Sequence, residues 1–121
     1  MSEILPAAQR LFSTRPTALV AAFAAVYHLL VDELGCEPRV KTIYVGFSRS
    51  DKMIAAIHPN PHDVGLFEIA LPAAATSVTP AAYDAPHLKW PMLPVAIAVA
   101  DDAESLEAAL DVIRAVATAA A

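Results

Sequence analysis

A chain of 121 residues has the size of one domain, so residues 1–121 are expected to fold around a single core. The net charge of −5, with only eight Lys and Arg, disfavours nucleic acid as the main partner because no general attraction to phosphates is available. No apolar run reaches the ~20 residues that span a bilayer, and the amino terminus lacks the pattern of a secretory signal. These features predict a cytoplasmic domain that is not a membrane protein.

Residues 1–16 are interpreted as an N-terminal extension to this domain. Within it, residues 2–12 are compatible with a short helix that Pro6 either begins or breaks. The one cysteine, Cys36, has no partner for an internal disulfide and no close basic neighbour, so it is expected to be a structural thiol.

Residues 17–34 are predicted to form an amphipathic helix that ends at Gly35. His28 and Asp32 lie four residues apart on its polar side and are interpreted as a solvated helix pair rather than a site. The apolar side chains at helical spacing are Leu19, Phe23, Val26, Tyr27, Leu30 and Leu34.

Three runs with a period of two follow, and they predict strands at residues 40–47, 52–58 and 64–71. The short links at residues 48–51 and 59–62 predict an antiparallel meander. A register with Phe47 opposite Lys52 and Ile54 opposite Phe67 avoids burying an unpaired Glu68. It places Ile43, Val45, Phe47, Ile54, Phe67 and Ile69 on one face, and Thr42, Tyr44, Met53, Ala55, Ile57, Leu66, Glu68 and Ala70 on the other.

The segment 72–94 carries five prolines and predicts a long irregular surface loop. Residues 95–100 alternate large and small apolar side chains, which is typical of a fourth strand, and Asp101 and Asp102 begin a C-terminal helix. This order predicts an α+β two-layer sandwich, in which an N-terminal and a C-terminal helix cover one face of a four-stranded meander. The second sheet face then has no obvious cover within the chain and is unusually apolar for open solvent.

The segments Arg39–Phe47, Lys52–Ile57 and Val95–Ile97, followed by the acidic-capped helix, resemble the bacterial domain of unknown function family numbered 5655. The resemblance covers roughly residues 17–117 and implies the fold only, because no activity comes with it. Some members of that family carry the label of predicted transport proteins. The family has an aromatic residue at the position of Met53.

The predicted register aligns Lys41 with His58 and His58 with Asp63 in one row at the sheet edge. A cation, an imidazole and a carboxylate side by side suit an anion site or an acid/base relay, whereas the plainer interpretation is a solvated row. The neighbouring His62 adds a possible ligand, but no His or Cys pair has a recognised metal spacing, so no metal site is predicted.

Trp90, the only tryptophan, lies in the proline-rich loop and either packs over an open core edge or closes a pocket. If this loop crosses the second sheet face, Trp90 is expected to meet Tyr44 and Met53 and to form a small apolar pocket with Glu68 as its polar member.

Two functions are compatible with these features. The first is a non-enzymatic module that forms a homodimer through the second sheet face. The alternative is a protein that binds a small molecule or an anion between that face and the loop, through Lys41, Tyr44, Met53, His58, Asp63, Glu68 and Trp90. No nucleophile lies in a recognised catalytic context, so no catalytic residue and no cofactor are predicted.

Overall fold

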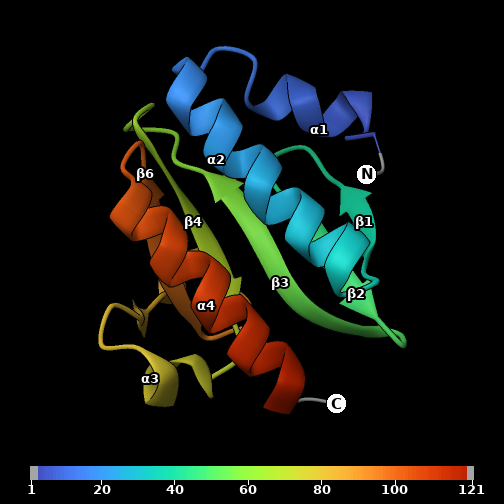
Figure 1. The fold of residues 1–121 in the computed structure, drawn as a ribbon, viewed down its shortest axis with the longest axis vertical. Helices are drawn as coiled ribbons and strands as arrows, with labels where there is room; N and C mark the ends of the chain where they lie inside the picture. Colours follow the sequence, from blue (N-terminus) through green and yellow to red (C-terminus); the bar gives the residue numbers. More distant parts are fainter. Residues whose placement is uncertain (1–2, 120–121) are drawn as a thin grey trace.

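An antiparallel sheet and two long helices form the α+β fold of the computed structural model, which describes residues 3–119 (Figure 1). Within this part of the chain the sheet has six strands in the order β1-β2-β3-β4-β6-β5, two more than expected. The strands are β1 (Glu37–Val40), β2 (Val45–Arg49), β3 (Lys52–Pro59), β4 (Leu66–Leu71), β5 (Tyr83–Asp84) and β6 (Val95–Ala100).

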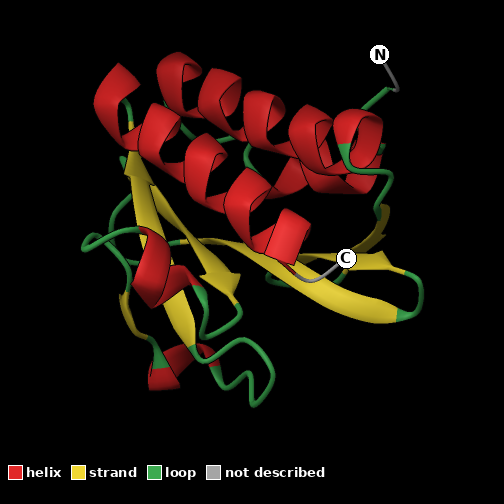
Figure 2. Cartoon of the chain, turned by 60° about the horizontal axis from the view of Figure 1, so that its bottom comes forward, coloured by secondary structure: helices red, strands yellow, loops and turns green. Residues whose placement is uncertain are grey.

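The helices form a second layer against one face of the sheet. Figure 2 shows the two long helices side by side above the strands, as the prediction requires. Across residues 3–119 no helix is long and apolar enough to cross a bilayer. The helical segments are α1 (Pro6–Leu11), α2 (Thr17–His28) with the π-helical turn η1 (Leu29–Glu33), α3 (Ala75–Val78), the 3-10 turn η2 (Pro86–Leu88) and α4 (Ala103–Ala119).

Local signals set the ends of these helices. Pro6 occupies the first turn of α1, where its missing N–H leaves no hydrogen bond unmade. Gly35 follows η1 with a φ of +71°, a left-handed conformation that favours glycine. At the start of α4, the Asp102 carboxylate accepts a hydrogen bond from the Ser105 backbone N–H at 2.6 Å, so the predicted acidic cap is confirmed.

Aromatic contacts join the helical layer to the sheet. Phe12 stacks on Phe23 with ring centroids 4.0 Å apart and meets Phe67 edge-on at 5.4 Å. Tyr27 meets Phe47 edge-on at 5.6 Å. These buried rings lie far apart in the chain, so the core depends on tertiary contacts rather than on any one element.

The predicted strand at 40–47 is wrong, because a tight turn divides it into β1 and β2. Within this turn the Lys41 N–H donates to the Tyr44 carbonyl at 2.8 Å. Ile43 therefore lies at the turn with 66% of its surface exposed, instead of in the core. Alternating apolar residues on both sides of the turn conceal it in the sequence.

The predicted pairing of β2 with β3 is also wrong. Arg49, not Phe47, lies opposite Lys52, because the link is a two-residue turn of Ser50 and Asp51. Both residues have positive φ, 55° and 63°, and such turns match the twist of antiparallel strands. A register shift between Phe47 and Ser48 accompanies the turn.

The link between β3 and β4 is longer than predicted, which moves their register. The Asn60 side chain accepts the backbone N–H groups of His62 and Asp63 at 2.8 and 3.0 Å, and the Asp63 carboxylate accepts that of Gly65 at 2.9 Å. These local bonds stabilise an extended loop instead of a four-residue turn.

The predicted register places Ile54 opposite Phe67. In the structure the two strands are shifted relative to that register, and Ile57 lies opposite Ile69. Ile57 and Ala55, predicted for the second face, are buried in the core below the helices. The large side chains of β6 face this core as expected, and they are Val95, Ile97 and Val99.

Candidate functional site

The second sheet face is covered from within the chain, contrary to expectation. The connection between β4 and β6 is not irregular throughout, since it contains α3, β5 and η2. Its last part, residues 83–94, is called the flap below and crosses the outer face of the sheet. An outer cluster forms there from buried Ala56, Ala70 and Leu93, with Tyr44, Met53, Leu88 and Trp90 packed against it.

Small side chains on the sheet allow this close approach. Ala56 lies opposite Ala70 across β3 and β4, and Ala70 lies opposite Ala96 across β4 and β6. The flap begins as β5, in which Tyr83 pairs with Ala96, and the Ala85 N–H donates to the Pro94 carbonyl at 2.9 Å. The alternation of large and small residues therefore supplies a core face and a shallow face for the flap.

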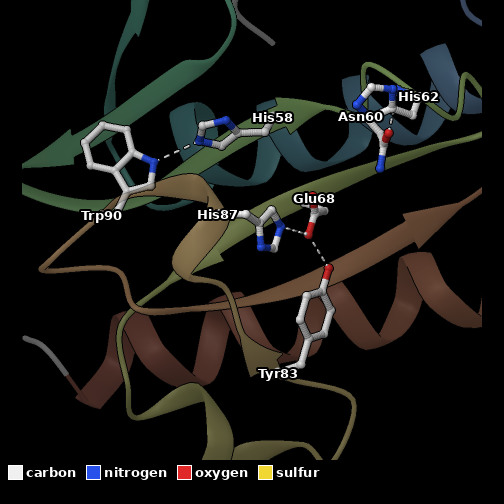
Figure 3. A network of polar contacts seen from close by, with 7 residues as sticks. All are labelled: His58, Asn60, His62, Glu68, Tyr83, His87 and Trp90. Carbon is white, nitrogen blue, oxygen red and sulfur yellow. Dashed lines mark hydrogen bonds and ion pairs between the residues drawn. The ribbon is translucent and has the colours of Figure 1, made fainter.

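His58 anchors the middle of the flap (Figure 3). It is only 7% exposed, and its Nε2 accepts a hydrogen bond from the Trp90 indole N–H at 2.8 Å. The Tyr44 ring stacks on His58 with centroids 5.2 Å apart and meets Trp90 edge-on at 5.0 Å. Burial lowers the pKa of His58, Glu68 opposes this shift and His87 adds to it.

Glu68 holds the beginning of the flap, because one of its carboxylate oxygens contacts both Tyr83 and His87 (Figure 3). The Tyr83 hydroxyl donates to this oxygen at 2.6 Å, and His87 Nε2 lies 2.9 Å from it. Glu68 is 8% exposed and lies directly opposite His58 across β3 and β4. Partial burial raises the pKa of Tyr83, which is 36% exposed, and the hydrogen bond to Glu68 and its negative charge raise it further.

Glu68→Gln should lower the pKa of Tyr83 toward its ordinary value of about 10, without reaching it because the burial remains. Because the folded protein favours the neutral phenol, Tyr83 stabilises the fold at neutral pH. This stabilisation is lost as the pH rises above about 10. The measurement is the tyrosinate absorbance during alkaline titration, with Tyr83→Phe subtracted. Glu104→Gln, an exposed change on α4, is the control, and an unchanged Tyr83 pKa in Glu68→Gln contradicts the assignment.

The predicted row of Lys41, His58 and Asp63 does not form. His58 lies opposite Glu68 instead, while Lys41 lies in the β1–β2 turn and Asp63 is held in the β3–β4 loop by its bond to Gly65. The structure does bring five of the predicted site residues to one face, and the flap makes its contacts on this face. These residues are Tyr44, Met53, His58, Glu68 and Trp90.

A pocket of about 470 Å³, called the hairpin pocket below, opens beside this cluster at the β2–β3 hairpin. Gly46 lies beneath its apolar wall, since a Cβ there would be 2.8 Å from the Met53 methyl carbon and 3.6 Å from the Tyr44 ring. The pocket is lined by Gly35, Glu37, Arg39, Lys41, Tyr44, Ser48, Arg49, Ser50, Asp51 and Met53.

Two cations of the hairpin pocket are available to a ligand. The Arg49 guanidinium is already used, because it donates to the Ala117 carbonyl at 3.0 Å and to the Leu34 carbonyl at 3.5 Å. Arg39 and Lys41 are exposed, and neither side chain forms an ion pair or hydrogen bond within residues 3–119. Their charges can therefore meet an anion without breaking an existing contact.

A second hollow, of about 500 Å³, lies on the flap and is less suited to a ligand. It is open along most of its rim, and its walls are mainly Trp90 and prolines. Its one cation, Lys89, shares the hollow with Asp84, so it offers no net charge. The hairpin pocket is more enclosed and has the better polar lining.

Sequence reasoning missed Tyr83, Arg39 and the contact of His87 with Glu68. Tyr83 and His87 lie in a segment without periodicity, so no pattern connects them with Glu68, 15 and 19 residues away. Arg39 could have been found, because it alternates with Lys41 at the start of a strand-like run. Within the described residues, no three or more His, Cys, Asp or Glu side chains are grouped to hold a metal ion.

No family model, no curated protein and no solved structure matches this chain. The side chains of the flap and of the hairpin pocket are therefore the features from which a function can be inferred.

Proposed function

We propose that this domain is a non-enzymatic cytoplasmic protein that binds a small anionic molecule in the hairpin pocket. The observation that carries the proposal is the presence of Arg39 and Lys41, two cations whose side chains have no partner within residues 3–119, in a partly open pocket of about 470 Å³. Membership of the family numbered 5655 stays a prediction and adds no activity to this proposal.

The composition of the pocket supports a small ligand with both a charged and an apolar part. Its volume lies within the usual range for small-molecule sites, about 300 to 1,000 Å³. Arg39 and Lys41 provide charge-assisted hydrogen bonds, while Tyr44 and Met53 provide an apolar wall. Glu37 and Asp51 also line the pocket and would repel a second negative group, which favours a ligand with one anionic end.

A homodimer through the second sheet face has less support, because the flap occupies much of that face. The two edge strands also resist pairing with another copy. β1 has four residues and contains Pro38, and β5 has two residues. Self-association stays a prediction, and native mass spectrometry of the purified protein reports the subunit count together with any retained ligand.

Phenyl phosphate is a suitable first probe, since it joins an anion to a planar apolar ring. We expect Lys41→Ala to weaken its binding about tenfold, as the loss of one charge-assisted hydrogen bond removes about 1.5 kcal/mol. Arg39→Ala should have an effect of at least this size. Isothermal titration calorimetry measures both, with inorganic phosphate and phenol as separate probes for the charged and the apolar part.

Matched variants distinguish the pocket from general surface charge. Lys52→Ala removes a nearby exposed cation that does not line the pocket, and Arg10→Ala removes an exposed arginine on α1. Both should leave the affinity unchanged. If Lys52→Ala weakens binding as much as Lys41→Ala, or if no probe binds the wild-type protein, the proposed site is wrong.

A further inference from the structure

One of the hydrogen bonds that attach the flap to the sheet exists in only one protonation state. The indole N–H of Trp90 can donate but cannot accept, so the His58 Nε2 at 2.8 Å must carry a free lone pair. The proton of the neutral ring is then on Nδ1. If His58 takes up a second proton, two N–H groups face each other across the contact, and the bond is replaced by a repulsion.

The groups around His58 do not compensate for this loss. Tyr44 stacks on its ring, Trp90 covers it, and Glu68 lies opposite on β4. Glu68 favours a charged His58, but its Oε2 already accepts the Tyr83 hydroxyl and contacts His87. A protonated His87 would oppose a second positive charge at His58. That charge would also be poorly solvated, because His58 is buried.

We propose that the flap, residues 83–94, is a pH-controlled cover that closes over neutral His58 and is released when His58 is protonated. Trp90 is partly buried in the closed state, so release exposes the rest of its ring and removes one neighbour of Tyr44, which forms a wall of the hairpin pocket. The release of the flap stands by itself, whereas a consequent change in ligand binding rests on the proposed function.

The direction of the pH effect follows from proton linkage. In the open state His58 is solvated and has its ordinary pKa of about 6.5, while burial in the closed state lowers that pKa. The open state therefore binds more protons in the interval between these two values. The closed state is fully favoured above about pH 6.5. Its closing equilibrium constant falls by up to about tenfold for each pH unit between about 6.5 and the lowered pKa of closed His58, and changes no further below that pKa.

The fluorescence of Trp90 tests the release directly, since the protein has one tryptophan. We expect acrylamide quenching to increase, and the emission to shift to longer wavelength, as the pH falls below about 6.5 in the absence of any probe ligand. Quenching by acrylamide reports access of solvent, so it is separate from direct quenching of Trp90 by a charged imidazole. The far-UV circular dichroism should stay constant over the same range, which excludes global unfolding.

His58→Gln is the decisive variant, because its amide oxygen can still accept from Trp90 but does not titrate. It should abolish the pH dependence of quenching and keep the flap closed. His62→Gln, which changes an exposed histidine in the β3–β4 loop, should preserve that dependence. The proposal is overturned if His58→Gln retains the wild-type pH profile, or if wild-type Trp90 stays protected below the measured pKa of His58.

A second measurement remains informative if His58→Gln does not fold. Trp90→Phe removes the indole donor, so the pKa of His58 followed by NMR should rise toward about 6.5. An unchanged pKa overturns the inference. Titration of benzenesulfonate, an aromatic anion whose charge stays constant over this range, at both ends of the pH range then separates the two proposals. A flap that opens while the affinity stays constant refutes only the coupling, and absent binding refutes only the pocket.

Discussion

Replacing Phe67 with alanine should lower the free energy of unfolding by about 3 to 5 kcal/mol, a large share of the roughly 5 to 15 kcal/mol typical of a domain. Phe67 lies on β4, is fully buried and meets the Phe12 ring edge-on with centroids 5.4 Å apart. Because Phe12 stacks in turn on Phe23, the truncation opens a cavity where α1, α2 and the sheet meet. Urea denaturation followed by circular dichroism measures the loss.

Val64→Ala provides the matched comparison for this change. Val64 lies two residues before β4 and is 55% exposed, so its truncation should alter the stability by no more than about 0.5 kcal/mol. If Phe67→Ala costs less than about 1 kcal/mol, the ring does not fill the core as the aromatic contacts indicate.

Replacing Leu93 with alanine should release the flap while the helical core stays folded. Leu93 is the buried apolar side chain that the flap inserts against Ala56 and Ala70. A buried Leu→Ala change removes about 2 to 5 kcal/mol, and the remaining attachment of the flap consists of the partly buried Leu88 and Trp90, the pairing of β5 and a few side-chain hydrogen bonds. We expect local opening, because these contacts are weaker than the lost burial.

Hydrogen exchange with detection by mass spectrometry measures this opening. Amides of residues 83–94 should lose protection in Leu93→Ala, whereas those of β3 and α4 should keep it. Met92→Ala changes the adjacent residue, which is 56% exposed, and should leave the exchange of the flap unchanged. Equal loss of protection in the flap and in α4 would show that the flap is not an independent unit.

Local patterns were sufficient for much of the α+β fold. The helix predicted at 17–34 is present as α2 and η1, and its end at Gly35 follows from the left-handed conformation of that residue. The strand at 95–100 is present as β6 with its large side chains facing the core. Periodicity and capping act over a few residues, so they are readable without knowledge of the partners.

The candidate site could be anticipated only in part. Tyr44, Met53 and Trp90 were expected to meet if the connection crossed the sheet, and the structure does bring them together. The predicted cross-strand pairing of His58 is wrong, because the Asn60 side chain stabilises a longer loop than the sequence pattern predicts. An error in one link displaces every cross-strand pair beyond it.

The amino-acid sequence by itself determined the class of fold, the long helices and the alternation of large and small side chains on β6, because these depend on neighbours close in the chain. Only the tertiary structure decided the strand register, the burial of the outer sheet face and the contacts of Glu68 and His58. The reason is that each of these contacts joins residues from separate elements, as with Trp90 and His58, which are 32 positions apart. Their meeting depends on the loop geometry and on the space left by small side chains at Ala56 and Ala70, and no local propensity encodes either.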